Sequence, residues 1–317
     1  MDGTRSGPAV RGASGRHCHG AVPHDSRMMA STFGPEWSAS LRRRDPAELA
    51  AWLDFALGCC DLADTLALAA FRTELQVEAK KDGSFVTQTD RAIELAIRER
   101  LADSFPDHGV VGEEYGTEAA DASVRWLLDP IDGTHNFMRT VPLFGTLLAV
   151  ECDGEVQAGV ISAPALGQRW FASRGQGAWT VGGPGRDRRR LRVSPETTVG
   201  RSQLLFRSVT DMHASRVSAG FDALLPVVWR ERGFGDFWGY ALVADGAAEA
   251  MVERDLGPWD IAAPWILVEE AGGRITDFDG QRSFARGESL ATNGFLHDAF
   301  LDRLWQRASD EVRLPAR

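Results

Sequence analysis

The chain has 317 residues, of which 44% are hydrophobic and 25% are charged, and its formal net charge is −10. This composition is typical of a globular protein with a sizeable core, and it excludes collagen, a coiled coil and a wholly disordered chain. The acidic balance argues against a nucleic-acid partner, because such proteins usually present a basic face, and no apolar run is long enough to predict a membrane span.

Residues 1–44 differ from the rest of the chain. They are rich in Gly, Ser, Arg and His and show little hydrophobic periodicity. The apolar stretch of a signal peptide is missing from them, although their Arg-rich and acid-poor character is shared with mitochondrial presequences. We expect a disordered tail, or an over-extended start with initiation near Met28 or Met29.

The chain has four cysteines, none of them in a C-x-x-C pair: Cys18, Cys59, Cys60 and Cys152. Two of them are adjacent, which disfavours a bridge between them. We therefore expect no disulfide framework and no zinc ribbon, but reduced thiols in a cytoplasmic protein.

Two amphipathic helices are expected at the start of the folded chain. Asp45-Pro46-Ala47-Glu48 offers an N-cap, a proline at the first helical position and a glutamate at the third. Apolar residues at helical spacing then continue to about Phe71. A second helix is expected to begin at Asp90 and to end before Pro106.

From Val124 the pattern changes to short apolar runs separated by Gly, Asp and Pro, which predict strands. Residues 126–128 lead into a turn, and a meander is expected over residues 144–150, 156–162 and 169–172. Residues 181–190 contain three Gly, one Pro and four Arg, and they predict a loop. A boundary near residue 190 would divide the folded chain into an N-terminal α+β subdomain (45–190) and a C-terminal α/β subdomain (191–317).

The C-terminal part mixes both kinds of element. Apolar runs at 204–206, 227–229 and 248–252 suggest strands, and helices are expected near 237–244 and 261–271. Gly272 and Gly273 end the last of these helices. The fold class is therefore α/β, in the broad sense that includes α+β.

The segment from Leu127 to Thr134, Leu-Leu-Asp-Pro-Ile-Asp-Gly-Thr, concentrates the chemistry. Asp129 and Asp132 stand three residues apart at the end of an apolar strand, and Gly133 lets the backbone turn and approach a ligand closely. Two carboxylates beside free backbone amides suit a divalent cation that holds a phosphate group. An Asp-Pro turn with Asp132 as a helix N-cap is the alternative interpretation of the same residues.

Three further acids stand at expected strand or helix ends. Glu113 follows an apolar pair, Asp260 opens a helix, and Asp90 begins another one. Each has an ordinary explanation taken alone: Glu113 as part of a solvated acidic pair, and the two aspartates as N-caps.

Taken together, these segments resemble the inositol monophosphatase superfamily. The resemblance is carried by Gly-Glu-Glu at 112–114, Asp-Pro-Ile-Asp-Gly-Thr at 129–134, and Trp-Asp-Ile-Ala-Ala at 259–263 with Glu-Ala-Gly-Gly after it. It spans about residues 46–305. Four further segments look like the bacterial histidinol-phosphate phosphatase branch: residues 162–167, 174–178, 233–240 and 291–297.

The resemblance implies a layered αβαβα sandwich and a Mg²⁺-dependent phosphomonoesterase with two or three ions. Water activated by the metal would attack L-histidinol phosphate, a small-molecule phosphate monoester, in histidine biosynthesis. Relatives are commonly dimers, so a homodimer is expected. Two alternatives stay open: a phosphatase of the same superfamily that acts on inositol phosphate, a sugar phosphate or a nucleotide, and a non-catalytic phosphate-binding protein.

Matching residue by residue, the resemblance implies a set of metal ligands: Glu113, Asp129, the carbonyl of Ile131, Asp132 and Asp260. Asp90 and Thr134 match the pair that orients the attacking water together with Glu113, and the amides of Gly133 and Thr134 would hold phosphate. Glu253 matches the position that contacts the alcohol portion of the substrate. Less directly, Lys80 matches a basic residue near the metal site.

The chemistry of histidinol suggests two more candidates. Its amine and imidazole suit acidic and aromatic partners, which Asp236 and Trp238 would supply by ion pairing and stacking. Asp236 has an alternative interpretation as a turn residue after Gly235, and Trp238 as a core residue. The chain also departs from the family at His135, where many relatives carry Lys, and at Pro264, which removes a hydrogen bond from the helix after Asp260.

Overall fold

The computed structural model describes residues 44–306, except residues 82 and 184–186. Both expectations for the N-terminal segment, and Cys18, therefore lie outside the described residues. The other three cysteines, Cys59, Cys60 and Cys152, are free and buried, as expected. Among the described helices, none is long and apolar enough to cross a membrane.

The central element is an eight-stranded mixed sheet. In spatial order its strands are β10 (Arg189–Arg190), β9 (Gly177–Gly182), β8 (Gln168–Ser173), β7 (Glu155–Ala163), β6 (Gly145–Cys152), β5 (Val124–Asp132), β3 (Gly109–Gly112) and β4 (Gly116–Glu118). Strands β6 to β8 form the expected antiparallel meander, which β5 and β9 extend on either side, while β3 runs parallel to β5. The carboxyl ends of β3 and β5 therefore lie at the same edge of the sheet.

A second sheet has five strands. In spatial order they are β12 (Arg230–Arg232), β11 (Gln203–Phe206), β13 (Ala250–Arg254), β15 (Glu288–Thr292) and β14 (Arg274–Thr276). Strand β11 pairs in parallel with β12 and β13, and β15 pairs antiparallel with β13 and β14. A small hairpin of β1 (Val77–Ala79) and β2 (Phe85–Thr87) stands apart.

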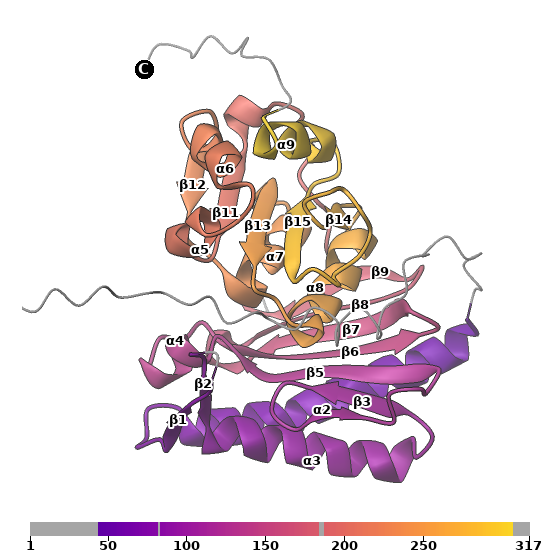
Figure 1. Ribbon diagram of the computed structural model, residues 1–317. Helices are drawn as coiled ribbons and strands as arrows, with labels where there is room; N and C mark the ends of the chain where they lie inside the picture. Colours follow the sequence, from indigo (N-terminus) through magenta and orange to yellow (C-terminus); the bar gives the residue numbers. More distant parts are fainter. Residues whose placement is uncertain (1–43, 82, 184–186, 307–317) are drawn as a thin grey trace, which may run out of the picture.

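The helices make three layers around the two sheets. They are α2 (Pro46–Ala70), α3 (Gln88–Ser104), α4 (Thr134–Met138), α5 (Val209–His213), α6 (Ser218–Leu224), α7 (Asp236–Ala244), α8 (Pro258–Glu270) and α9 (His297–Leu304), with short 3-10 turns at Pro164–Leu166 and Val199–Arg201. Figure 1 shows α2 and α3 below the large sheet, α7 and α8 between the sheets, and α6 and α9 beyond the small sheet. This is the expected αβαβα order.

Local signals explain where the two long helices begin. The Asp45 side chain caps α2 by accepting a hydrogen bond from the N–H of Ala47 at 3.0 Å. Helix α3 starts two residues earlier than predicted, because Thr87 is its N-cap and Asp90 occupies the third helical position. Asp90 therefore accepts a hydrogen bond from the cap residue instead of being the cap itself.

Two sequence predictions were wrong in detail. Residues 181–190 are not all loop, because β9 extends to Gly182 and Arg189–Arg190 pairs with Trp179 and Thr180. The guanidinium of Arg188 lies 4.3 Å from the Trp179 ring centre, a cation–π contact that composition alone does not reveal. The strand expected at 227–229 is displaced to β12, whose charged residues form the edge of the small sheet.

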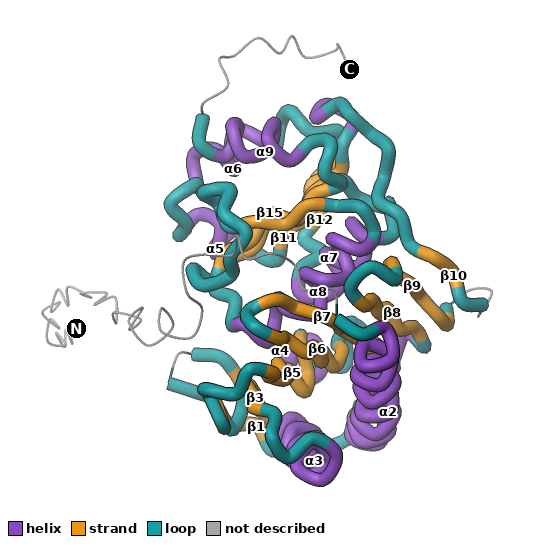
Figure 2. Tube along the Cα trace, turned by 90° about the vertical axis from the view of Figure 1, so that its right-hand side faces the viewer, coloured by secondary structure: helices purple, strands orange, loops and turns teal. Residues whose placement is uncertain are grey.

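Helix α8 joins the two halves of the chain into one core. The largest buried cluster combines Leu127 and Leu147 of the large sheet with Ile261 and Trp265 of α8. Figure 2 shows the strands of the large sheet as a row between α2 and α3 on one side and α7 and α8 on the other. A division into subdomains near residue 190 stays a prediction, and the shared core shows that the two halves pack tightly on each other.

The close approach of α8 to β7 depends on Gly159. A Cβ atom at this position would lie 2.8 Å from Cγ2 of Ile266 and 3.0 Å from Cα of Ala263. Pro264, one residue further along the helix, is accommodated without a break, and α8 continues to Glu270. The glycine thus sets how closely the helix lies on the sheet.

Candidate active site

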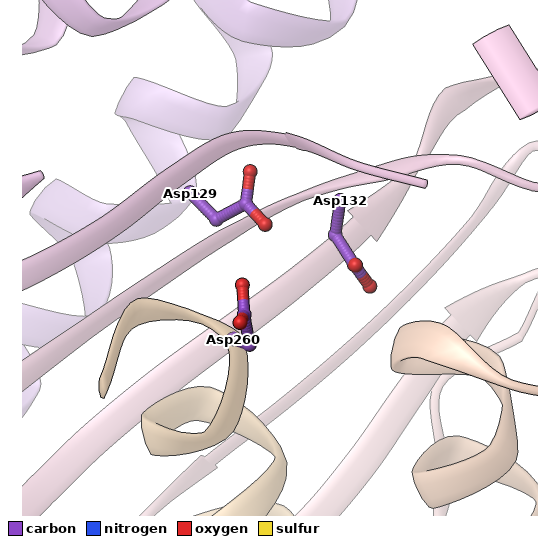
Figure 3. A group of neighbouring side chains, drawn as sticks. All are labelled: Asp129, Asp132 and Asp260. Atoms are coloured by element: carbon purple, nitrogen blue, oxygen red, sulfur yellow. The ribbon is translucent and has the colours of Figure 1, made fainter. Parts of the chain in front are cut away.

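Three carboxylates from two elements converge at one end of the large sheet. Asp129 and Asp132 lie at the end of β5, and Asp260 lies in the first turn of α8. One carboxylate oxygen from each residue can be chosen so that all three lie within 4.8 Å of one another. Figure 3 shows the carboxylates of Asp129 and Asp260 pointing toward each other, with Asp132 beside them.

The backbone of β5 is shaped to present its two aspartates. The pairing with β6 is irregular between Asp129 and Asp132. Within this irregularity, Oδ1 of Asp129 accepts a hydrogen bond from the N–H of Ile131 at 2.9 Å, and Thr146 Oγ1 donates to the carbonyl of Pro130 at 2.8 Å. The irregularity lets both carboxylates face the same space, although a regular strand would turn residues three apart to opposite faces.

Gly133 ends this segment in the left-handed conformation, with φ of 80°. A Cβ atom there would lie 2.9 Å from the carbonyl oxygen of Leu143, so the position needs glycine for space as well as for conformation. Gly133 is also the N-cap of α4, so the interpretation of Asp132 as the cap of this helix was wrong.

Asp260 is positioned by its place in α8. It is the third helical residue, and its Oδ2 accepts a hydrogen bond from the N–H of Gly257 at 2.6 Å. The alternative interpretation of Asp260 as the N-cap was therefore wrong, because Gly257 holds that place. Oδ2 of Asp260 is thus occupied by the N-terminus of the helix, and Oδ1 is left for the cavity.

Burial and mutual repulsion make these acids hard to ionise. Burial raises the pKa of Asp129 well above its usual range, and the charges of Glu113, Asp132 and Asp260 raise it further. Burial raises the pKa of Asp260 to about 7, with the charge of Glu113 adding to this effect. The pKa of Asp132 is raised for the same kind of reason, with burial the largest cause and Asp236 the next.

Glu113 reaches the same site from the end of β3. Its Oε1 lies 2.7 Å from Nζ of Lys80, which also lies 2.8 Å from Oε1 of Glu114. Lys80 thus bridges the acidic pair, as its predicted place near the site would suggest. The interpretation of both glutamates as solvated was wrong for Glu114, whose side chain is only 3% exposed and whose pKa burial raises to about 7.

Asp90 and Thr134 lie together as the sequence predicted. The Thr134 hydroxyl lies 3.3 Å from Oδ1 of Asp90 and 2.9 Å from the carbonyl oxygen of Ile131. The other carboxylate oxygen of Asp90 accepts a hydrogen bond from the N–H of Thr87 at 2.9 Å. Burial raises the pKa of Asp90 to about 6.

The acidic cluster lies in a cavity of about 1420 Å³ that extends well beyond it. Its wall includes Glu253 on β13 together with Asp236 and Trp238 at the start of α7. The N–H of Asp236 points to Oε1 of Glu253 at 3.4 Å, and the N–H of Phe237 donates to Oδ2 of Asp132 at 2.5 Å. The first turn of α7 therefore connects the predicted alcohol-binding residues to the acidic cluster.

Asp236 has an unusual backbone, with φ of 56°. A non-glycine residue in this region carries strain, which is often found where a side chain must be presented to a ligand. Burial raises the pKa of Asp236, while the charge of Arg207 lowers it. Trp238 is half-buried and packs on Phe234 with ring centres 4.9 Å apart, so it is a wall residue rather than a core residue.

Of the histidines that the structure describes, none belongs to the acidic cluster. His135 is exposed and meets the Phe85 ring edge-on, with ring centres 5.1 Å apart. His297 is fully buried between the hydroxyls of Thr276 and Thr292. Neither arrangement places a histidine among the carboxylates.

Sequence reasoning missed two residues that shape the site. Glu94 is completely buried and accepts hydrogen bonds from the N–H groups of Glu114 and Tyr115. It stands one helical turn after Asp90, so helical spacing could have placed it on the same buried face. Arg207 contacts two acids of the cavity wall, Asp211 and Glu253, and nothing in its local sequence marks it.

The donor set suits a hard divalent cation. The three convergent carboxylates offer only oxygen ligands. Mg²⁺ and Ca²⁺ prefer such a ligand set, whereas Zn²⁺ and Cu²⁺ sites usually include nitrogen or sulfur ligands. The raised pKa values of the three aspartates result in part from repulsion between neighbouring carboxylates, which a bound cation would relieve. On these grounds the residues present fit a metal ion.

Comparison with known proteins gives a consistent result. The model of the inositol monophosphatase family matches residues 48–309. A histidinol-phosphatase of Mycobacterium tuberculosis is 42% identical over 253 residues, which cover 80% of this chain and 97% of the relative. One from Streptomyces coelicolor is 40% identical and covers 78% of this chain and 94% of its own. The solved structure of an IMPase from Thermotoga maritima superposes with a TM-score of 0.72 at 31% identity, covering 81% of this chain and 97% of that one.

Proposed function

Because this chain belongs to the inositol monophosphatase family, we propose that it is a Mg²⁺-dependent phosphomonoesterase that hydrolyses L-histidinol phosphate to L-histidinol and phosphate. The convergence of Asp129, Asp132 and Asp260 carries the phosphatase part of the proposal. The substrate rests on two relatives, 42% and 40% identical, that bear the name histidinol-phosphatase.

The proposed ligand set is the one that the family resemblance implies: Glu113, Asp129, the carbonyl of Ile131, Asp132 and Asp260. When bound there, Mg²⁺ neutralises the phosphate dianion, lowers the pKa of water and stabilises the leaving alkoxide. The chain itself contributes the fixed positions of these oxygens. Because buried acids with raised pKa values compete for protons, ion binding should release protons near neutral pH.

The attacking water is oriented by Thr134 in this proposal. The hydroxyl of Thr134 lies between two acceptors, Asp90 and the carbonyl of Ile131, and donates to one of them. Its own oxygen can then accept a hydrogen bond from water and so direct a lone pair of that water toward phosphorus. Glu113 is the second candidate to hold this water, and the amides of Gly133 and Thr134 are the proposed phosphate donors.

The alcohol half of the substrate would lie against Glu253, Asp236 and Trp238. Histidinol carries an ammonium group and an imidazole, and carboxylates beside an aromatic wall suit both. A buried carboxylate has lost its contact with water, so it attracts a cationic group of the substrate strongly. Inositol-1-phosphate offers only hydroxyl groups and supplies no such charge.

The test compares kcat/KM for L-histidinol phosphate and inositol-1-phosphate with Mg²⁺, each repeated with EDTA. We expect a preference of about a hundredfold for histidinol phosphate, or roughly 2.7 kcal/mol of transition-state discrimination, and loss of both activities with EDTA. The reverse preference would contradict the substrate and leave the phosphatase intact. Mg²⁺-dependent binding without turnover would show a phosphate-binding protein instead of an enzyme.

A further inference from the structure

Arg207 follows β11 and lies in the wall of the cavity, where it contacts acids from two different elements. Its Nε lies 3.1 Å from Oδ2 of Asp211 and 3.7 Å from Oε1 of Glu253. Its Nη2 donates to the carbonyl of Arg254 at 3.1 Å. The guanidinium is therefore held in place by α5 and β13 and is not free to follow a ligand.

Glu253 depends on this guanidinium. Its carboxylate is 2% exposed, and Oε1 is the oxygen directed at Arg207 and at the N–H of Asp236. Oε2 makes no hydrogen bond of ordinary geometry to any described residue, although the Tyr240 hydroxyl interacts with the carboxylate. Glu253 is thus held through Oε1, while Oε2 has no hydrogen bond of ordinary geometry to a described residue.

Arg207 also supports Asp236 through the backbone. A Cβ atom at Gly235 would lie 2.4 Å from Cα of Arg207, so the two chain segments are in direct contact. The next residue, Asp236, has the strained φ of 56° and directs its N–H at Glu253. The position of Arg207 therefore affects the positions of both acids that are predicted to bind the alcohol, Glu253 and Asp236.

The charges explain what the guanidinium does. The guanidinium contacts the carboxyl groups of Asp211 and Glu253, and it interacts electrostatically with that of Asp236. Burial raises the pKa of Glu253 to about 8 and the charge of Arg207 opposes this rise. Without the guanidinium, a buried carboxylate would lose its counter-charge and take up a proton more readily.

We propose that Arg207 is a positioning residue that orients the carboxyl groups of Glu253 and Asp236 in the cavity wall and thereby makes the site selective for phosphate monoesters of cationic amino alcohols. The inference rests on the proposed function and deepens it. Arg207 itself does not touch the cation, because its guanidinium is engaged by Asp211 and the carbonyl of Arg254. Selectivity comes from the carboxylates that it orients.

The test uses Arg207→Gln, Arg207→Lys and a matched control, Arg232→Gln. Arg232 lies on the neighbouring strand β12, and its guanidinium donates to the carbonyl of Glu231 at 2.7 Å. For each protein, kcat/KM with Mg²⁺ is measured on L-histidinol phosphate, inositol-1-phosphate and p-nitrophenyl phosphate. Binding of L-histidinol and of myo-inositol is measured in parallel by calorimetry with Mg²⁺ and inorganic phosphate.

For Arg207→Gln we expect the preference for histidinol phosphate over inositol-1-phosphate to fall at least tenfold. The loss should lie in KM for the cationic substrate and in the affinity for L-histidinol, with p-nitrophenyl phosphate affected less than threefold. Arg207→Lys should recover most of the preference, because the charge is kept, and Arg232→Gln should match the wild type.

Equal losses of Arg207→Gln on all three esters would mean that Arg207 is merely structural, and this would overturn the inference while the proposed function stands. If the Gln variant does not fold, Asp211→Asn, which removes the anchor of the guanidinium, must lower the same preference, or the inference fails. A wild-type protein that prefers inositol-1-phosphate, or hydrolyses no ester, would contradict the proposed substrate and the inference together.

Discussion

Oε2 of Glu94 accepts a hydrogen bond from the N–H of Glu114 at 2.8 Å, and this bond ties a buried residue of α3 to the segment that carries Glu113. Oε1 of the same carboxylate accepts from the N–H of Tyr115 at 3.1 Å and from Nε of Arg98 at 2.9 Å. Glu94 therefore holds the segment from beneath without itself lining the cavity.

Glu94→Gln should loosen Glu113 without removing it. The amide nitrogen would face an N–H donor, which leaves a buried donor unpaired and costs roughly 1–3 kcal/mol. We expect a lower melting temperature, and a Mg²⁺ concentration for half-maximal activity that rises about tenfold. Glu99→Gln, on the exposed face of the same helix, is the control. Unchanged Mg²⁺ dependence in Glu94→Gln would show that the segment is held by other contacts.

Asp129→Asn should abolish turnover and leave the fold intact. It removes one buried charge from a cluster of like charges while keeping the shape of the side chain. The metal-free variant should therefore melt at the same temperature as the wild type or a few degrees above it, with Mg²⁺ stabilising it less. Calorimetry with and without Mg²⁺ measures this, and Asp121→Asn, at an exposed position, is the control. Near-normal activity would contradict the metal site.

The metal-free protein should become more stable as the pH falls from 8 to 6.5. Asp260 and Glu114 have pKa values of about 7, chiefly because of burial, against values near 4 in an unfolded chain. In this interval the folded state holds more protons than the unfolded state, so its free energy of unfolding rises with acidification. Saturating Mg²⁺ should weaken this trend, because it displaces the protons. Denaturant melts at four pH values, with EDTA and with Mg²⁺, test both parts.

Below pH 6.5 a second group acts in the opposite direction. Burial lowers the pKa of His297 from 6.5 to about 3. Its contribution to stability is therefore fully present above pH 6.5 and falls as the pH drops toward 3, because the unfolded chain takes up a proton that the folded state does not. The slope from one group is at most about 1.4 kcal/mol per pH unit. His297→Asn should be less stable at neutral pH and show a flatter acid limb. His213→Asn, at an exposed histidine paired with Asp222, should keep the wild-type profile.

Much of the fold followed from local signals. The cap at Asp45, the meander over residues 144–172 and the helix over Asp260 each depend on residues close in sequence, and each is present in the structure. The displaced β12 shows the limit. An edge strand is defined by its partner β11, and the apolar run 227–229 beside it carries no information about that pairing.

The candidate site was predictable where a motif marks it. Asp129, Asp132 and Asp260 belong to recognisable segments, and the structure brings them together. The residues that support them were not found, because Arg207 and Glu94 act through contacts 46 and 20 residues away. Such contacts are fixed by the packing of layers, which a pattern along the chain does not describe.

Gly159 gives this packing a consequence for chemistry. Asp260 lies near Asp129 on a helix that packs closely on β7, and the absence of a side chain at residue 159 permits that close packing. The distance between the two carboxylates therefore depends on a buried contact between the helix layer and the sheet, away from solvent and substrate. A single methyl group added at Gly159 would push α8 away from β7. It would thereby change the size of ion that the carboxylates can share, although it alters no atom that touches the ion.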